Sequence, residues 1–338
     1  MHVGALNPIS SLLLKCRNPM TNQNSTEGRT LFEARRLGHV NLFVHDIDRS
    51  VNFYRDVVGL GVAWRRTNMR TGFLSNGNSH HDIGLIDLHG PLGQTNHAAL
   101  NHLAFEVETQ VDLVDGYRRA KSQGFRFTAM YDHEISHSLY YDDADGTQIE
   151  IYADTDVDWQ ERLVNPIKAS LDKWEPGKQP PSPERYYRQN PVFMRHDDAI
   201  FHPTKVTHAA LFVRDLEVAS KDYQRTLGLS PTLGTVKDGF ISLAGSCGNR
   251  DLTLLQADQN HPAGLSHFGF EAWSEDDLRQ SVARARSADV AIESELRDEH
   301  RYSVIFPDPD GFRVQIYVDR KPLEAVVSLP RSSLTHLV

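Results

Sequence analysis

The amino-acid sequence predicts an α+β protein built from four βαβββ units that are paired into two domains. The first supporting observation is an internal repeat: His39 to Asp46 recurs as His208 to Asp215, 169 residues later, and His102 to Glu106 recurs as His267 to Glu271, 165 residues later. The second is that each half divides again, because a strand followed by a helix and further strands begins at His39 and again at His102. The repeat is the strongest structural signal in the chain.

The first unit opens with the alternating run from Gly38 to Val44, in which every second residue is aliphatic, as in a strand with one buried face. Asp46 is a good N-cap for the helix that follows, and Gly59 is placed to end it. The sequence then predicts three strands, over residues 62–66, 71–75 and 82–88.

The second unit opens with the strand that carries His102. Thr109 and Asp112 form the pattern of a capping box at the start of a helix, and Gly124 is placed to end that helix. Strands close the unit, with a turn at Asp145 and Gly146 before the strand over residues 148–152.

The composition is that of an ordinary globular protein, with 338 residues, 39% hydrophobic and 24% charged. A net charge of −9 gives no basic surface for nucleic acid and little attraction to anionic membranes. Two cysteines are too few for a disulfide framework or a thiolate metal site, and no apolar run is long enough for a membrane span. We therefore expect a cytoplasmic protein with neither nucleic-acid nor membrane partners. Whether translation starts at Met1 or Met20 stays open.

Three strands share one design, in which an aliphatic face is opposed by a potential metal ligand. His39 and His102 each lie opposite aliphatic residues on their strands, and Glu150 lies between Ile149 and Ile151. Any one of these residues alone is more often part of a core. Two histidines and one carboxylate together form a set that leaves coordination positions open, which suits non-haem Fe(II), with Mn(II) as the alternative.

These elements divide the chain into five parts. We expect a flexible N-terminal tail over residues 1–35, a metal-binding catalytic domain over 36–155, a linker over 156–204, a paired domain over 205–320 and a C-terminal tail over 321–338. The linker is punctuated by prolines and is long for a plain connection, so part of it should pack on a domain.

Two further stretches resemble a known family. His80 to Ile86 resembles a strand that presents an active-site histidine, and Asp132 to Glu150 resembles a closing segment in which a histidine and a tyrosine precede a glutamate ligand. With the triad, they are similar to the vicinal oxygen chelate superfamily, which has a glyoxalase-like fold. More narrowly, they resemble the type I extradiol ring-cleavage dioxygenases, including catechol 2,3-dioxygenase.

The resemblance implies partly open, curved sheets and a dioxygenase that cleaves a catechol ring with O2 at Fe(II) held by His39, His102 and Glu150. It also implies accessory roles for three residues. His81 would stabilise charge on oxygen and donate a proton, while His133 and Tyr140 would hydrogen-bond a catecholate oxygen. Aromatic catabolism is the implied setting, and we expect a homo-oligomer.

The sequence departs from the commonest members in two ways. The complete ligand set lies in the N-terminal half, whereas His208 and His267 are joined by Gln315, a weaker ligand, so we expect the second site to be degenerate and without iron. The spacing before Tyr140 is also short, which leaves His137 as a competitor of His133 for the accessory role.

Three alternatives remain at this point. A hydroxyphenylpyruvate-type dioxygenase would share the triad, a glyoxalase-like isomerase would use the metal without oxygen, and a non-enzymatic small-molecule binding protein would need no metal. Trp64, Met69 and Phe73 are interpreted as core residues rather than pocket residues. Arg118 and Arg119 are interpreted as surface residues rather than a clamp for an anionic substrate.

Overall fold

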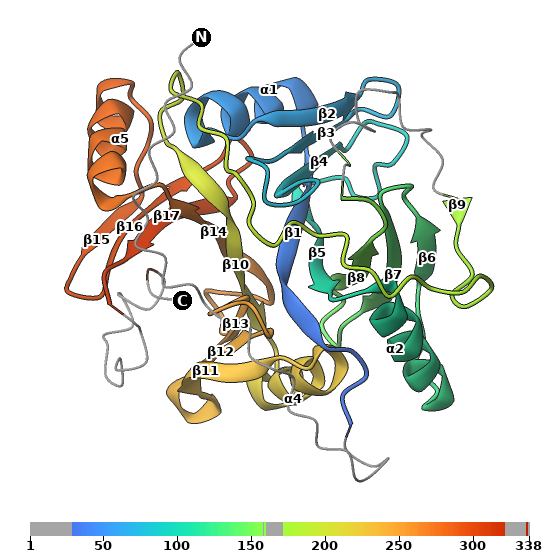
Figure 1. Cartoon of the computed structure of the whole chain (residues 1–338). Coiled ribbons are helices and arrows are strands. Elements are labelled where there is room, and N and C mark those ends of the chain that lie inside the picture. The colour runs from blue at the N-terminus through green and yellow to red at the C-terminus, as the bar shows by residue number, and fades with distance from the viewer. Residues whose placement is uncertain (1–28, 158, 160–171, 322–335, 337–338) are drawn as a thin grey trace.

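The computed structural model describes residues 29–157, 159, 172–321 and 336, and they form two curled sheets that lie side by side (Figure 1). The first half contains β1 (Ala34–Val44), α1 (Ile47–Phe53), the π-helical turn η1 (Tyr54–Val58), β2 (Val62–Arg66), β3 (Thr71–Leu74), β4 (Ile83–Asp87), β5 (Ala99–Val107), α2 (Gln110–Ser122), β6 (Ala129–Asp132), β7 (Ser136–Asp142), β8 (Gln148–Asp154) and β9 (Asp172–Lys173). The second half contains β10 (Pro203–Val213), α4 (Leu216–Leu227), β11 (Ser230–Thr235), the 3-10 turn η2 (Val236–Asp238), β12 (Phe240–Ala244), β13 (Leu252–Gln256), β14 (Gly264–Ala272), α5 (Glu275–Ser287), β15 (Ser294–Arg297), β16 (Arg301–Pro307) and β17 (Arg313–Asp319). The βαβββ order thus occurs four times, and the predicted fold class is confirmed.

The strand order places three strands together in the middle of the first sheet. Its order is β2-β3-β4-β1-β5-β8-β7-β6-β9, and the second sheet repeats it as β11-β12-β13-β10-β14-β17-β16-β15. β1 pairs with β4 in parallel and with β5 antiparallel, so the β1–β5 pairing joins the two units of a half. β5 in turn pairs with β8 in parallel. Neighbouring strands are about 4.8 Å apart, so residues at matching heights on β1, β5 and β8 lie close together.

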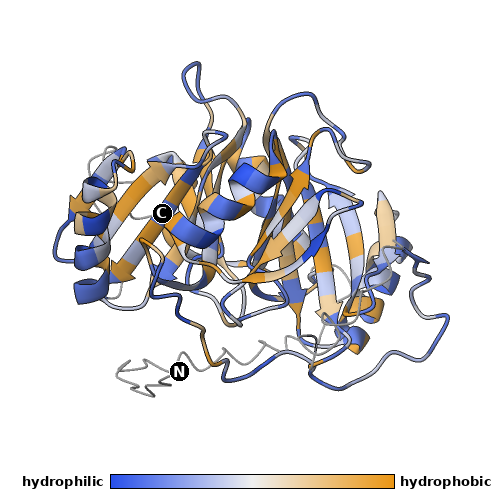
Figure 2. Ribbon diagram, turned by 90° about the horizontal axis from the view of Figure 1, so that it is seen from above, coloured by the Kyte–Doolittle hydropathy of each residue, from blue (hydrophilic) through white to orange (hydrophobic). Residues whose placement is uncertain are grey.

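The period-2 pattern decides which face of β1 is buried in the core. Val40, Leu42 and Val44 are fully buried in the hydrophobic core, while His39 and Asn41 lie on the opposite face. The alternation of hydrophobic and hydrophilic residues is visible along the strands in Figure 2. Each sheet therefore has an apolar face that stabilises the fold and a concave face that is free to carry polar groups.

The helix ends match the predicted signals. The Asp46 side chain accepts from the backbone N–H groups of the first turn of α1, and Thr109 accepts from Asp112 N–H at the start of α2. Gly59 ends the first helical segment in the left-handed region, with φ of 91°. The π-helical turn before it was not predicted. It widens the last turn at Tyr54, whose carbonyl accepts the N–H groups of both Gly59 and Leu60.

The two halves meet along β1 and β10 through contacts that obey the internal repeat (Figure 1). Leu37 N–H donates to Asp251 Oδ1 at 2.8 Å, and the equivalent Val206 N–H donates to Asp82 Oδ1 at 2.9 Å. Each hydrogen bond therefore has an equivalent in which the roles of the two halves are exchanged. The halves are related by an approximate two-fold arrangement.

A second reciprocal set joins helix ends to carboxylates. Tyr54 Oη–H donates to Asp308 Oδ2 at 2.9 Å, and Tyr223 Oη–H donates to Asp143 Oδ2 at 2.7 Å. These four side chains connect the helical segment of each half to the last turn of the other half.

The described residues before residue 36, which the sequence assigned to the N-terminal tail, pack against the core. Leu31 and Phe32 are fully buried, and their N–H groups donate to the carbonyls of Arg225 and Thr226 in the other half. The rest of the expected N-terminal tail, together with most of the C-terminal tail and part of the linker, lies outside the described residues. The described linker does pack on the first half, since β9 extends the sheet beside β6. Within the described ranges, none of the helices is both long and apolar enough to cross a membrane.

Candidate metal centre

His39, His102 and Glu150 meet on the concave face of the first sheet. Glu150 Oε2 lies 3.0 Å from His39 Nε2 and 2.9 Å from His102 Nε2, and the two imidazole nitrogens are 3.4 Å apart. The register explains this convergence, because His39 and Glu150 are each paired with Ala104, on opposite sides of β5. All three residues are at least 95% buried.

The spacing of these three atoms fits a metal ion. Ligands that occupy adjacent positions at about 2.1 Å from an ion are about 3.0 Å from one another, and the three separations here are 2.9, 3.0 and 3.4 Å. Two neutral nitrogens and one carboxylate are also the donor set of the 2-His-1-carboxylate metal site. The side chains are thus arranged to hold a divalent cation without rearrangement of the strands.

The protonation states of the three side chains also favour metal binding. Burial lowers the pKa of His39 to about 4, so this imidazole is neutral at pH 7 and can offer a lone pair. His102 Nδ1 lies 2.7 Å from Asn101 Oδ1, an oxygen that can only accept, so the proton is on Nδ1 and Nε2 is free to act as a ligand. Burial by itself would raise the pKa of Glu150, but contact with His39 and His102 holds it well below its usual value.

His81 lies beside the triad, where the sequence predicted it. Its ring packs on that of His39, with centroids 3.9 Å apart, and its Nε2 lies 3.1 Å from Asn41 Oδ1. Asn41 is two residues after His39 on β1 and so shares its face. A Cβ at Gly84 would lie 2.0 Å from Asn41 Oδ1, so the glycine leaves room for this contact. Burial, with His39 close by, lowers the pKa of His81 well below its usual value and leaves the ring neutral.

His133 and Tyr140 form a pair on the other side of the triad. His133 Nε2 lies 3.0 Å from Tyr140 Oη. Burial lowers the pKa of His133 to about 4, while burial and the Glu150 carboxylate raise that of Tyr140 well above its usual value. The neutral imidazole and the phenol are therefore joined by one hydrogen bond, and the His133 tautomer decides which of the two groups donates. His137 does not line the cavity beside the triad; it stacks on Trp174 with centroids 4.5 Å apart.

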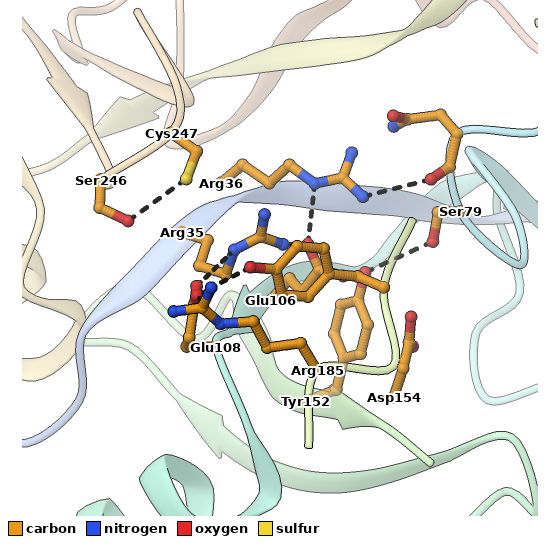
Figure 3. Close-up of polar contacts among 12 residues, drawn as sticks. Arg35, Arg36, Ser79, Glu106, Glu108, Tyr152, Asp154, Arg185, Ser246 and Cys247 are labelled. Atoms are coloured by element: carbon orange, nitrogen blue, oxygen red, sulfur yellow. Dashed lines mark hydrogen bonds and ion pairs between the residues drawn. The ribbon is translucent and has the colours of Figure 1, made fainter. Parts of the chain in front are cut away.

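A buried polar network supports the strands behind the triad (Figure 3). Glu106 on β5 accepts from Arg35 Nη1 at 2.5 Å and from Arg36 Nε at 2.8 Å, so one buried carboxylate is matched by two cations from β1. Tyr152 on β8 lies between this network and the triad, since its ring is 5.2 Å from that of His39. This network ties together β1 and β5, the strands that carry the two histidines.

The equivalent place in the second half is filled by protein groups. Arg301 is fully buried, and its Nη1 donates to His336 O at 3.0 Å and lies 3.5 Å from Gln315 Oε1. Gln315 Nε2 also donates to His336 O, at 3.0 Å. In the described chain, the close groups of three His, Cys, Asp or Glu side chains all lie in the first half. The second half thus carries a fixed cation where the first half has its converging ligands.

A cavity of about 200 Å³ opens beside the triad, and some of its lining residues were not anticipated. Trp64 and Phe73, interpreted from the sequence as core residues, stack on each other at 4.2 Å and line the cavity, so that interpretation was wrong for these two. Arg66 and His80 also line it and were missed. Arg66 had a signal, since it is two residues after Trp64 on the same strand, whereas the burial of His80 depends on contacts that the sequence does not reveal.

Comparisons with known proteins agree with this fold. A family model described as the Glyoxalase/Bleomycin resistance protein/Dioxygenase superfamily matches residues 36–151 and 205–316. A biphenyl-2,3-diol 1,2-dioxygenase of Rhodococcus globerulus is 30% identical over 122 residues, which are 35% of this chain and 63% of that protein. The match therefore spans less than two thirds of this relative's length.

Solved structures extend the similarity to both halves. The 2,3-dioxygenase LapB of Pseudomonas sp. KL28 superimposes with a TM-score of 0.62 at 17% identity, covering 86% of this chain and 96% of that one. The Mn(II)-bound glyoxalase of Novosphingobium aromaticivorans gives a TM-score of 0.61 at 17% identity, covering 86% and 85%. At these identities the structures establish a shared fold. Together with the family match and the dioxygenase relative, they confirm the resemblance inferred from the sequence.

Proposed function

The chain belongs to the Glyoxalase/Bleomycin resistance protein/Dioxygenase superfamily, and from this premise we propose that it is an extradiol dioxygenase. The reaction would cleave the ring C–C bond next to the two hydroxyl groups of a catechol and would add both atoms of O2 to the product. The metal would be Fe(II), held by His39, His102 and Glu150 in the first half.

One observation carries this proposal: the three donor atoms converge within 3.4 Å of one another at the wall of a cavity large enough for an aromatic ring. Two imidazole nitrogens directed at one buried carboxylate are the donor set of a metal site, which a metal-free binding protein does not need. Two relatives favour oxygen chemistry over isomerisation: the biphenyl-2,3-diol 1,2-dioxygenase of Rhodococcus globerulus and a catechol-2,3-dioxygenase of Bacillus subtilis, which is 30% identical over 92 residues.

Bound there, Fe(II) would supply open coordination positions for the two oxygens of a catechol and for O2. The residues of this chain would then handle protons and orientation. The His133–Tyr140 pair lies next to Glu150 and would orient one catechol oxygen and hydrogen-bond it as it loses its proton. His81, held by Asn41 and neutral in the free site, would take up a proton that the catechol releases on binding, stabilise negative charge on oxygen, and return that proton as the O–O bond breaks.

Purification without air, loading with Fe(II) and addition of catechol with O2 would test the proposal. We expect one O2 consumed per catechol, a yellow ring-opened product, and two labelled oxygen atoms in it when 18O2 is supplied. Turnover of the methylglyoxal–glutathione adduct without O2 uptake would instead support an isomerase. Failure of the iron-loaded protein to consume O2 with a panel of catechols would overturn the proposal.

Glu150→Gln tests the metal ligands most directly. It gives the first half the same residues as the equivalent place in the second half, two histidines and a glutamine. We expect it to lose tight iron binding and essentially all activity. Glu271→Gln makes the same chemical change on the exposed face of β14 and should bind iron and turn over as the wild type does. Equal iron content and activity in the two variants would exclude Glu150 as a ligand.

A further inference from the structure

Three polar groups that line the cavity have no hydrogen-bond partner within the described residues. They are Trp64 Nε1, Arg66 Nε and Thr71 Oγ1, and each of these atoms is buried. The sheet brings them together, because Arg66 pairs with Thr71 across β2 and β3, and Trp64 shares the face of Arg66 two residues earlier. Buried donors without partners cost free energy, so this corner of the cavity is suited to donate hydrogen bonds to an acceptor on a bound molecule.

The charge of Arg66 is also unmatched. Among the described residues, no carboxylate lies within ion-pair distance of its guanidinium, and Glu150 is the only acidic residue that lines the cavity. Its neighbour Arg65 is the contrast, since it points to the outside of β2 and pairs with Asp48 at 2.6 Å. Burial lowers the pKa of Arg66, and the charge of Glu134 offsets this only in part. Arginine presents a planar fork of donors that matches a carboxylate.

The distance from the triad fits a short substituent on a single ring. The Trp64 ring lies 5.6 Å from that of His81, which packs on His39, and Arg66 is two residues further along the strand, about 7 Å. An apolar cavity of about 150 Å³ is known to take one benzene, and this cavity measures about 200 Å³. The stacked rings of Trp64 and Phe73 form a flat apolar wall between the triad and Arg66. One ring with a short side chain therefore reaches from the triad to the unpaired donors.

We propose that the substrate is a monocyclic catechol whose side chain carries a carboxylate, and that Arg66, with Trp64 Nε1 and Thr71 Oγ1, binds that carboxylate. This inference rests on the proposed function, because it assumes that the diol end of the molecule lies at the triad. Arg66 is then a specificity residue that contacts the substrate away from the reacting bond.

The test compares Arg66→Gln with Arg65→Gln, the same change one residue away on the exposed face. The substrates are 3,4-dihydroxyphenylacetate and the uncharged 4-ethylcatechol. Loss of Arg66 should lower kcat/KM for the carboxylate substrate by about 10- to 100-fold, mostly through KM, and change that for 4-ethylcatechol by less than about 3-fold. Arg65→Gln should change neither, and Arg66→Lys should recover part of the loss.

Binding measured by calorimetry without O2 separates this inference from the proposed function. If wild-type protein binds 3,4-dihydroxyphenylacetate more tightly than 4-ethylcatechol and Arg66→Gln abolishes the difference, the subsite holds whether or not the ring is cleaved. Equal binding of the two compounds, or an equal loss for both in a folded Arg66→Gln protein, would overturn it. Thermal melting by circular dichroism identifies misfolding, and Arg66→Lys then provides the decisive comparison.

Discussion

A single hydrogen bond determines which nitrogen of His102 faces the other ligands. Asn101 Oδ1 accepts from His102 Nδ1–H at 2.7 Å, which leaves the Nε2 lone pair directed at Glu150 and His39. His39 has no such partner among the described residues, because its Nδ1 is buried without a hydrogen bond. The orientation of the first ring is therefore maintained by packing, and that of the second by a polar contact that mutation can remove.

Replacement of Asn101 by leucine should weaken metal binding by about 10- to 100-fold, since the imidazole is then free to rotate and to change tautomer. Competition with a chelator of known affinity measures this. Asn96 and His97 supply a matched control, because they form the same contact at 3.0 Å on an exposed loop. Asn96→Leu should leave the affinity unchanged. Equal affinities for the two variants would show that Asn101 does not position the ligand.

Among the structural elements, those with strong local signals were predictable and those that depend on distant partners were not. The strand over residues 62–66 was predicted with the bounds that the structure has for β2, and both glycine helix ends were anticipated. β9 has only two residues and exists because β6 offers it an edge. The packing of Leu31 and Phe32 likewise depends on α4 of the other half. No local sequence pattern predicts this packing.

The residues of the candidate site likewise differ in whether the sequence could predict them. Alternation along strands predicted that His39, His102 and Glu150 each lie opposite the aliphatic face of their own strand, whereas the order that makes these strands neighbours is set by pairing between distant segments. Arg66 had only one local signal, its place on the same strand face as Trp64, and a charged residue at that place is more often exposed than part of a cavity. Its role as a cavity residue emerges only when β2 curls over the triad, which depends on pairing with β3.

Substitution of Gly59 tests how much the left-handed end of the first helical segment contributes to stability. Its φ of 91° disfavours any other residue, and a Cβ there would lie 2.0 Å from the carbonyl oxygen of Phe201. Gly59→Ala should lower the free energy of unfolding by about 2–5 kcal/mol, through left-handed strain and a backbone clash together.

Gly124 is the control for that measurement, because its φ is 75° and a Cβ would meet nothing within 4 Å. Gly124→Ala should cost only the left-handed strain, about 1–2 kcal/mol. Urea denaturation of both variants measures the difference. Equal losses would mean that the contact between Gly59 and the segment before β10 contributes nothing to stability.

For the whole molecule, the interface between the halves contains a buried carboxylate that responds to pH. Burial raises the pKa of Asp308 from 3.8 to about 6, and hydrogen bonds from Phe312 N–H and Tyr54 Oη–H offset this only in part. The folded protein therefore holds a proton that the unfolded chain has already released between pH 3.8 and about 6. The stability from this group is full below the unfolded pKa and is lost as the pH rises through about 6.

Asp308→Asn should remove this pH dependence. The amide oxygen can still accept the backbone N–H groups, and the amide nitrogen can donate to Tyr54 Oη. Relative to wild type, the variant should gain up to about 3 kcal/mol in free energy of unfolding between pH 4 and pH 7. Urea denaturation of the metal-free proteins across this range measures it, with the exposed Asp276→Asn as the control. Parallel curves for Asp308→Asn and wild type would contradict the assignment.

Arg301 makes the loss of ligands in the second half difficult to reverse. If Gln315 were changed back to glutamate, the new carboxylate would stand beside a fully buried guanidinium that already lies 3.5 Å from the glutamine oxygen. Arg301 already pairs with Asp319 at 2.7 Å, and Arg250 pairs with the same carboxylate at 3.1 Å. A new carboxylate would therefore be balanced by the second arginine, and no net negative charge would remain to attract a cation. A working metal centre in the second half would therefore require replacement of Arg301 as well as of Gln315.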